Sequence, residues 1–307
     1  MPHFKWGLYE NSQFYGPHHS IGCRLLLGGC GSDGGGGVAS TPAPTYSTLQ
    51  QMVAQGGNRK FSTSGIQADV SNAVPAYANN TYGSGVTVAY TASSDSYTLT
   101  APNGTVQAFL PSDITSTPGS SAVAYVKSAG ANFDLFAIAP ASVNGVTLSY
   151  TLFGTWLHAT GSATTIWLAA GGVPTQANDM PRNGTASYST TVTGNAQMLA
   201  NPAAGYTLDA NSTATFSANF SAGTVATSLN LVGVPTSGGG ATSSFGTFNG
   251  TGTIASSGPG FSGTFTGPVA GTFSGNFNGP QAAEMAYGWG LNTSGLSAFG
   301  QVAGKKN

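Results

Sequence analysis

Charged residues are scarce in this chain. Its 307 residues include 8 Lys and Arg and 9 Asp and Glu, which together make 6%, whereas average soluble proteins carry about 25%. The formal net charge of −1 gives no basic surface for a nucleic acid and no polybasic segment for anionic lipid. We therefore expect a surface covered by Ser, Thr, Asn and Gly, and no nucleic-acid partner.

Cysteine, histidine and glutamate are scarce as well. The 2 cysteines, Cys23 and Cys30, leave the rest of the chain without a disulfide framework or thiol chemistry. After Cys30 the chain has one histidine, His158, and one glutamate, Glu284, so a glycosidase with paired glutamates is excluded. No His/Cys/Asp cluster has the spacing of a metal site. No apolar run reaches the length of a transmembrane helix, about 18 residues.

What the sequence does contain favours an all-β fold. Hydrophobic residues make 40% and aromatic residues 10%, enough to bury a core, and Thr, Val, Tyr and Phe suit pleated strands better than helices. One short helix is expected at 46–55, where Ser47 and Gln50 have the spacing of a capping box and Gly56 can end the helix. Alternating apolar residues predict strands over most of the remaining chain.

The C-terminal part carries a repeat of phenylalanine and glycine. Phe-Ser-Gly-Thr-Phe-Thr-Gly at 261–267 returns as Phe-Ser-Gly-Asn-Phe-Asn-Gly at 273–279. Phe and Gly share one face of each strand, so consecutive copies can pair antiparallel with phenyl rings over the neighbour's glycines. This pattern predicts a small closed barrel, which has no exposed edges. The rings are expected to form its core; the alternative is that they line an apolar ligand cavity.

The segment Leu-Leu-Leu-Gly-Gly-Cys-Gly-Ser at 25–32 resembles the lipobox of bacterial lipoproteins. The resemblance implies cleavage of a signal peptide before Cys30 and acylation of Cys30. The glycine-rich run at 33–40 and the Thr-Pro-Ala-Pro after it predict a flexible tether. The alternative is that Cys23 and Cys30 are ordinary cysteines of a leader, because the residues upstream lack a basic region and a clean apolar stretch.

Three further stretches, taken with this lipobox, resemble one known family. Residues 153–156 are Phe-Gly-Thr-Trp, residues 172–188 lead from Pro-Thr through Met-Pro to Gly-Thr-Ala-Ser-Tyr, and residues 275–284 are Gly-Asn-Phe-Asn-Gly-Pro-Gln-Ala-Ala-Glu. In this order they resemble bacterial surface lipoproteins of the transferrin-binding protein B-like class, in a single-lobe form. The resemblance implies a handle-like antiparallel β-domain followed by an eight-stranded antiparallel β-barrel.

The predicted division of the chain follows from these segments. We expect a leader with the lipobox-like Cys30 and a Gly-rich tether at 1–44 and a handle-like β-domain at 45–170. A linker at 171–182, rich in Gly, Pro, Asn and Asp, would then lead to the barrel at 183–307.

His158 is the one weak candidate for a ligand-binding residue. A Ser-His-Asp triad could only be centred on it, with Asp134 or Asp179 as partner, although no spacing indicates this. Related single-lobe proteins include heme binders, so the resemblance allows His158 as a ligand of heme iron; we otherwise expect no cofactor. A structural histidine is the favoured alternative. Glu284 is expected in a short turn that plugs one end of the barrel, where its carboxylate accepts backbone N–H groups.

The sequence therefore predicts a non-enzymatic protein, a monomer anchored by lipid to the outer membrane or cell surface of a Gram-negative bacterium. It would bind a host or environmental protein, or a small solute such as heme, through loops of the barrel. A structural or adhesive surface protein without a soluble ligand is the alternative, and a hydrolase with an unrecognised site is a third possibility.

Overall fold

Two β-sheets pack face to face in the N-terminal half of a computed structural model, which describes residues 44–307 except 118–121, 162, 202–204 and 238–239. We call this pair of sheets the handle. In the described residues one sheet has the strand order β1-β4-β5-β6 and the other β3-β2-β10-β9-β8-β7. The first sheet contains β1 (Arg59–Phe61), β4 (Thr87–Thr91), β5 (Ser96–Thr100) and β6 (Val106–Phe109). The second contains β2 (Ser64–Asp69), β3 (Ala76–Asn80), β7 (Val123–Ala129), β8 (Asn132–Val143), β9 (Val146–Thr160) and β10 (Ala163–Gly172).

The handle has its own aromatic core between the two sheets. Trp156 on β9 and Trp167 on β10 are almost fully buried, with ring centroids 4.6 Å apart. Phe109 from the opposite sheet lies 5.5 Å from the Phe136 ring of β8. Such offset or tilted ring pairs stabilise beyond the area they bury.

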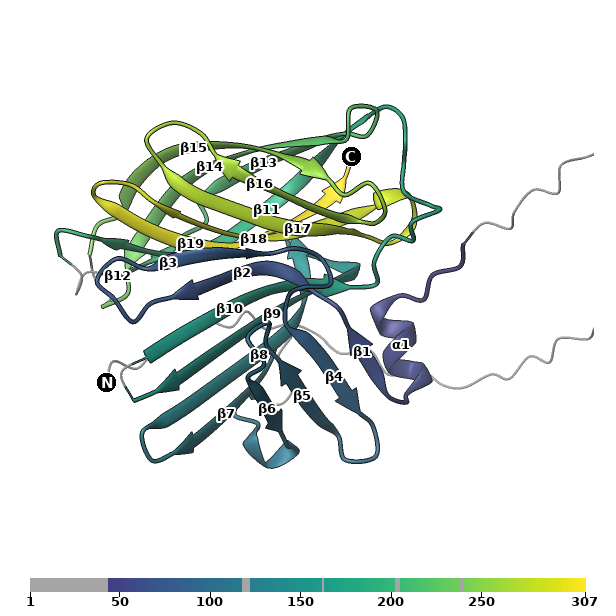
Figure 1. Cartoon of the computed structure of the whole chain (residues 1–307), viewed down its shortest axis with the longest axis horizontal. Helices are drawn as coiled ribbons and strands as arrows, with labels where there is room; N and C mark the ends of the chain where they lie inside the picture. The colour runs from purple at the N-terminus through teal and green to yellow at the C-terminus, as the bar shows by residue number, and fades with distance from the viewer. Residues whose placement is uncertain (1–43, 118–121, 162, 202–204, 238–239) are drawn as a thin grey trace, which may run out of the picture. The chain divides into compact units, whose positions relative to one another are not determined.

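The C-terminal half is a closed antiparallel barrel, seen above the handle in Figure 1. Within the described residues, eight strands form a ring in the order β11-β13-β14-β15-β16-β17-β18-β19, and β19 pairs back to β11. The strands are β11 (Thr185–Met198), β13 (Thr213–Asn219), β14 (Thr224–Pro235), β15 (Ser243–Ile254), β16 (Gly260–Phe265), β17 (Ala270–Asn278), β18 (Glu284–Asn292) and β19 (Leu296–Lys306). The short β12 (Gly205–Leu208) pairs with β11 and β14 beside β13. The predicted all-β fold with an eight-stranded antiparallel barrel is confirmed.

The Phe/Gly repeats pair as the sequence predicts. On β16 and β17, Phe261 stands opposite Gly275 and Gly263 opposite Phe273. A Cβ atom added to Gly263 would lie 2.5 Å from Cζ of Phe273, and one added to Gly275 would lie 2.6 Å from Cζ of Phe261. The rings therefore occupy the space that a side chain would take, and they fill the barrel as its core. The prediction of a core, and not of a ligand cavity, is confirmed for these rings.

A buried polar seam joins the barrel to the handle. The carboxylate of Glu284, at the start of β18, accepts N–H bonds from Ser149 (2.8 Å) and Tyr150 (2.9 Å) and the hydroxyl of Thr151 (2.8 Å), all on β9. It follows a 3₁₀ turn at Pro280–Ala282. Glu284 thus accepts backbone N–H groups as expected, but from the handle.

Two asparagines extend this seam along β17. Asn276 accepts the Ser64 hydroxyl of β2 at 2.6 Å and donates to Asn278 Oδ1 at 2.7 Å. Asn278 in turn donates to the Thr151 hydroxyl at 3.1 Å. Both asparagines are completely buried. Buried polar groups need hydrogen-bond partners, and the two side-chain amides have them in one another and in Ser64 and Thr151 of the handle.

The α-helix α1 (Leu49–Gln55) confirms the predicted helix with a shift at its start. Thr48, and not Ser47, is the N-cap, and its capping box closes with Gln51, one residue after the expected Gln50. Thr48 caps the helix because its hydroxyl accepts the N–H of Gln51 while the Gln51 side chain accepts the N–H of Thr48.

The segment before this helix is hydrogen-bonded, through Asp179, to the turn that precedes β18. The Tyr46 hydroxyl donates to Asp179 Oδ2 at 2.8 Å, and the same oxygen accepts the N–H of Gln281 at 2.9 Å. Burial alone would raise the pKa of the Asp179 carboxyl, but these hydrogen bonds outweigh burial and lower the pKa. Burial is also the main cause that raises the pKa of Tyr46 to about 12.

The glycine–phenyl contacts predict a specific loss of stability. Gly275→Ala would force its methyl group against the Ala286 carbonyl and Tyr287 of β18 as well as against Phe261, and we expect the free energy of unfolding to fall by about 1–3 kcal/mol, the cost of overpacking a core. Gly295→Ala is the matched control, since its methyl group would meet no atom within 4 Å. Urea unfolding measures both variants. Equal stability of the two would contradict the packing described here.

Candidate functional site

His158 lies at one end of the handle core and is held by a carboxylate. Its Nδ1 lies 2.7 Å from Asp134 Oδ1, and the same oxygen accepts Trp156 Nε1–H at 2.9 Å. Asp134 and His158 are opposite one another on β8 and β9. A carboxylate oxygen only accepts, so Nδ1 carries the hydrogen in this contact.

This arrangement fits a structural histidine. The His158 side chain is 22% exposed and its ring lies 5.9 Å from that of Trp156. Of the two proposed partners, the structure brings Asp134 to His158, whereas Asp179 contacts Tyr46 and Gln281. Neither of the two grooves described below is lined by His158. A heme-ligand role for His158 stays a prediction.

The sequence also predicts acylation of Cys30, no metal site and no transmembrane helix. Cys30 lies outside the described residues, so its acylation stays a prediction. In residues 44–307, as far as they are described, no three His, Cys, Asp or Glu side chains lie close enough to hold a metal ion. The helix that the structure describes is too short to span a bilayer.

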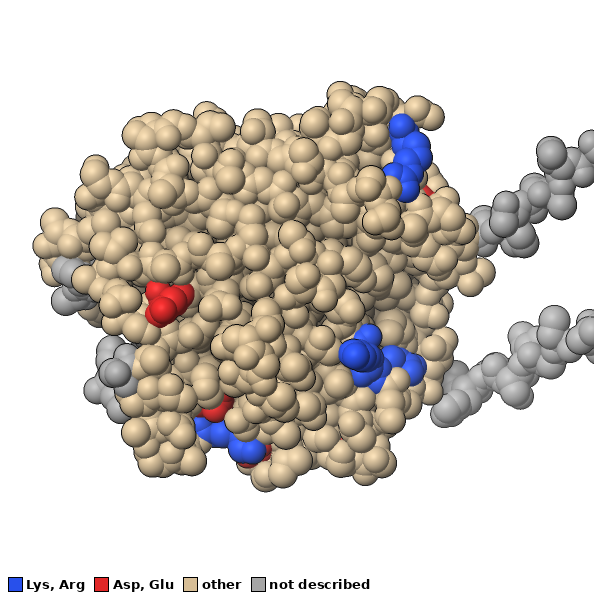
Figure 2. Space-filling view, in the orientation of Figure 1, with Lys and Arg blue, Asp and Glu red and all other residues tan. Residues whose placement is uncertain are grey.

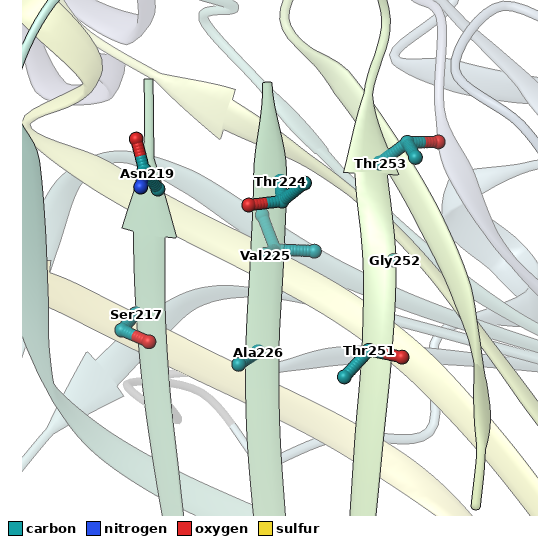
Figure 3. Close-up of a pocket in the computed structure, with 8 residues that line it drawn as sticks. All are labelled: Ser217, Asn219, Thr224, Val225, Ala226, Thr251, Gly252 and Thr253. Carbon is teal, nitrogen blue, oxygen red and sulfur yellow. The ribbon is translucent and has the colours of Figure 1, made fainter. Parts of the chain in front are cut away.

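A shallow groove of about 580 Å³ runs over the outer face of three barrel strands. Figure 3 shows its lining residues on β13, β14 and β15: Ser217, Asn219, Thr224, Val225, Ala226, Thr251, Gly252 and Thr253. All of them are uncharged, and their polar groups are hydroxyls and one amide. The groove can therefore donate and accept hydrogen bonds, but its lining side chains include no acid, base or thiolate for catalysis.

At one end of the barrel β11 and β14 end and β12 and β15 begin, and we call this end the barrel mouth and define it by the apolar residues Met198, Tyr206, Val234 and Phe245. Met198 is 36% and Val234 37% exposed. The Tyr206 and Phe245 rings pack edge to face with centroids 5.2 Å apart, and both remain partly exposed. Tyr206 stands opposite Pro235 and Thr207 opposite Val234, so Val234 points to the outer face of the barrel and Tyr206 to the inner face. The mouth therefore presents apolar surface on the ends of rigid strands.

The handle adds one more apolar residue beside this mouth. Gln197, which precedes Met198, donates to the carbonyl of Ala73 at 3.5 Å, and the next residue, Val74, is 51% exposed. Sequence reasoning missed the mouth because it lies where strand ends and a distant turn meet.

Charged groups do not form a patch on the face seen in Figure 2, where a few separate blue and red groups lie on a largely uncharged surface. This agrees with the low charge of the sequence. Recognition on this face therefore depends on hydrogen bonding and apolar contact, since there is no focused field to steer a charged partner.

No protein-family model matches the chain, and no curated protein matches it. Several solved structures are similar to it. A mutant of transferrin-binding protein B from Haemophilus parasuis is 16% identical with a TM-score of 0.45, over 81% of this chain and 45% of that one. HpuA from Kingella denitrificans, solved in complex with human haemoglobin, is 15% identical with a TM-score of 0.38, over 87% and 95% of the two chains.

The fold resembles a single lobe of transferrin-binding protein B. This is the resemblance that the sequence motifs predict. The N-lobe of lactoferrin-binding protein B from Moraxella bovis is also similar, at 14% identity and a TM-score of 0.33 over 55% of this chain and 79% of that one. The chain spans about half the length of the transferrin-binding protein B structure. At these values the similarity concerns the fold alone.

Proposed function

We propose that this chain is a non-enzymatic surface lipoprotein that binds a partner through the barrel mouth. The observation that carries the proposal is that four apolar residues lie on strand ends at the mouth, with Met198 and Val234 exposed and Tyr206 and Phe245 partly buried. Apolar side chains exposed at the same end of a barrel can be buried against a partner, which favours binding there. Strands fixed in a closed barrel hold them in place, which lowers the entropy lost on binding.

The partner fits a protein better than a small solute. The barrel interior is filled by rings such as Phe273 and Phe277, both completely buried, so the mouth is a surface and not the entrance to a deep cavity. Small ligands prefer concave sites that bury most of their surface. A host or environmental protein can instead cover the mouth and Val74 together, and similar folds include proteins solved with or named for haemoglobin, transferrin and lactoferrin.

Anchoring to the outer membrane or cell surface is the second part of the proposal. It is supported by the lipobox-like residues that end at Cys30 and by the glycine-rich run after it. Two or three acyl chains on one cysteine hold a protein on a membrane stably, because each buried CH₂ contributes about 0.8 kcal/mol.

Fatty-acid labelling tests the anchor. Cells that express the chain and receive a clickable palmitate analogue should label it, and Cys30→Ala should abolish the label because no acceptor thiol then remains in the lipobox. Cys23→Ala is the matched control and should keep the label. Equal labelling of the wild type and Cys30→Ala would refute the anchor.

Capture of a partner tests the mouth. The wild type and a variant with Met198→Ser and Val234→Ser are immobilised and exposed to host serum. We expect the variant to lose at least about tenfold in affinity for the partner, because burying two apolar side chains contributes more than 1.4 kcal/mol. The matched control carries Val106→Ser and Val146→Ser, which are 58% and 55% exposed on the handle, and it should bind as the wild type does.

Two results would count against this use of the mouth. If all three proteins capture the same partner equally, binding lies elsewhere on the molecule. If none captures a protein from serum or from culture fluid, a structural or adhesive role without a soluble ligand becomes the better account.

A further inference from the structure

The chain enters the described part of the molecule at a fixed place. The Tyr46 hydroxyl donates to Asp179 Oδ2 at 2.8 Å and accepts the N–H of Gln176 at 2.9 Å. The same carboxylate oxygen accepts the N–H of Gln281, in the turn before β18, at 2.9 Å. We call this place the tether end and define it by Tyr46, Asp179 and Gln281, because the predicted Gly-rich tether joins the molecule here.

Three cations of the C-terminal half lie at the tether end. Lys306 Nζ donates to the carbonyl of Gln281 at 3.0 Å, and Lys305 is the residue before it on β19. The Arg182 guanidinium donates to the carbonyl of Ala177 at 3.3 Å, in the segment whose main chain also holds the Tyr46 hydroxyl. The end of β19 and the residues before β11 thus bring positive charge to one place.

Two cations of the handle lie beside the same end. Arg59, at the start of β1, donates to the carbonyl of Met52 on α1 at 3.2 Å, and Lys60 follows it. The sixth cation of the described residues, Lys127, lies instead 3.8 Å from Asp113 on the handle. Three distant stretches of the sequence therefore supply five of these six cations to one end, although no stretch is polybasic by itself. Figure 2 shows blue groups toward the side of α1, separate from the blue and red groups at the lower edge.

Acidic groups balance these cations only in part. Asp179 and Glu284 are buried at the tether end and accept hydrogen bonds there. Asp95 accepts the hydroxyl of Tyr90 at 2.9 Å, and Tyr90 stands opposite Arg59 on β4. Five cations thus face three acids, whereas the rest of the described residues hold one cation and four acids. The molecule therefore carries its positive charge mainly at the tether end.

The barrel mouth lies at the other end of the barrel. On the ladder between β11 and β19, Lys306 stands opposite Tyr188, whereas Met198 of the mouth stands opposite Leu296. The ten residues from 188 to 198 correspond to about 33 Å of strand. In Figure 1, α1 and β12 accordingly lie on opposite sides of the molecule. A surface that meets the tether end leaves the mouth uncovered.

We propose that the tether end rests on the anionic lipid headgroups of the membrane that carries the anchor, with the barrel mouth directed away from it. This inference rests on the lipid anchor proposed above. Residues 31–44 separate Cys30 from the described part, and a Gly-rich chain of about 14 residues spans about 20 Å on average. An acylated Cys30 therefore keeps the cations near the headgroups, where each Lys or Arg contributes about fivefold in affinity.

The spacing of the cations favours a lipid surface over a small anion. Their side chains come from β1, β19 and the segment before β11, and they do not line a common groove. Neither the groove over β13 to β15 nor a second groove of about 720 Å³, between β11 and the tip of the β8–β9 hairpin, includes a lysine or arginine in its lining. An extended anionic surface can meet separate cations at once, whereas a single phosphate group needs donors that converge.

Vesicle flotation of the full chain with Cys30→Ala tests this surface without the anchor. Vesicles of equal parts phosphatidylglycerol and phosphatidylcholine should bind the chain, and binding should weaken as salt is added. Lys305→Gln should weaken binding about fivefold, and adding Lys60→Gln should bring the loss to at least about tenfold. Both lysines are exposed, so the fold should be kept. Lys127→Gln is the matched control and should bind as the parent chain does.

A dye at either end of the barrel reports the orientation. It is attached through Ser257→Cys, next to the carbonyl of Ser256 that accepts a hydrogen bond from Arg182, or through Ser237→Cys, just beyond β14. Both chains also carry Cys23→Ser and Cys30→Ala. Brominated lipid in the anionic vesicles should quench the dye at position 257 and leave the dye at position 237 bright. Equal quenching, or the reverse, would contradict the proposed orientation.

Three further results would overturn the proposal. They are no binding to the anionic vesicles, equal binding of Lys305→Gln and Lys127→Gln, and equal binding to vesicles of phosphatidylcholine alone. Tighter binding to heparin than to the vesicles would assign the tether end to a soluble polyanion and overturn it as well. Fatty-acid labelling of Cys30 is read separately, so a chain that binds these vesicles but takes no label would refute the anchor and leave the lipid-binding surface.

Discussion

The buried carboxylate of Glu284 is the interaction on which the arrangement of barrel and handle depends. It accepts two backbone N–H groups and one hydroxyl from β9 of the handle. If the carboxylate were removed, each donor left buried without a partner would cost about 1–3 kcal/mol. The chain has few charged residues, and this one is buried. It joins β18 of the barrel to β9 of the handle. Asn276 and Asn278 extend the same seam toward β2.

This seam determines what the rest of the surface can present. β17 and β18 turn their phenyl and tyrosyl rings into the barrel and their polar side chains toward the handle, so both faces are buried there. The opposite strands, β13 to β15, keep a hydroxyl-bearing face in solvent. The barrel mouth lies on β11, β12, β14 and β15, whereas the hydrogen bonds of this seam join β17 and β18 to β2 and β9. Such a scaffold suits binding by preformed surfaces.

The sequence allowed prediction of those features that depend on local repetition. The Phe/Gly register of β16 and β17 follows from a repeat of twelve residues, and the closed barrel follows from that pattern. Alternation alone places Asn276 and Asn278 in solvent, and only the packing of the handle buries them. The pairing of Asp134 with His158 could not be predicted from the sequence either. A bulge between Pro140 and Ser142 shifts the register that the Asn-Gly turn at 144–145 would set.

Because the seam joins the handle to the barrel, the two parts should unfold together as one cooperative unit. Incorporated 5-fluorotryptophan tests it most directly, because Trp156 and Trp167 lie in the handle core and Trp289 in the barrel core. The ¹⁹F signals of the three residues, followed through urea unfolding, should disappear with one common midpoint, since the seam couples the two cores. Separate midpoints for Trp289 and for the handle pair would contradict the claim.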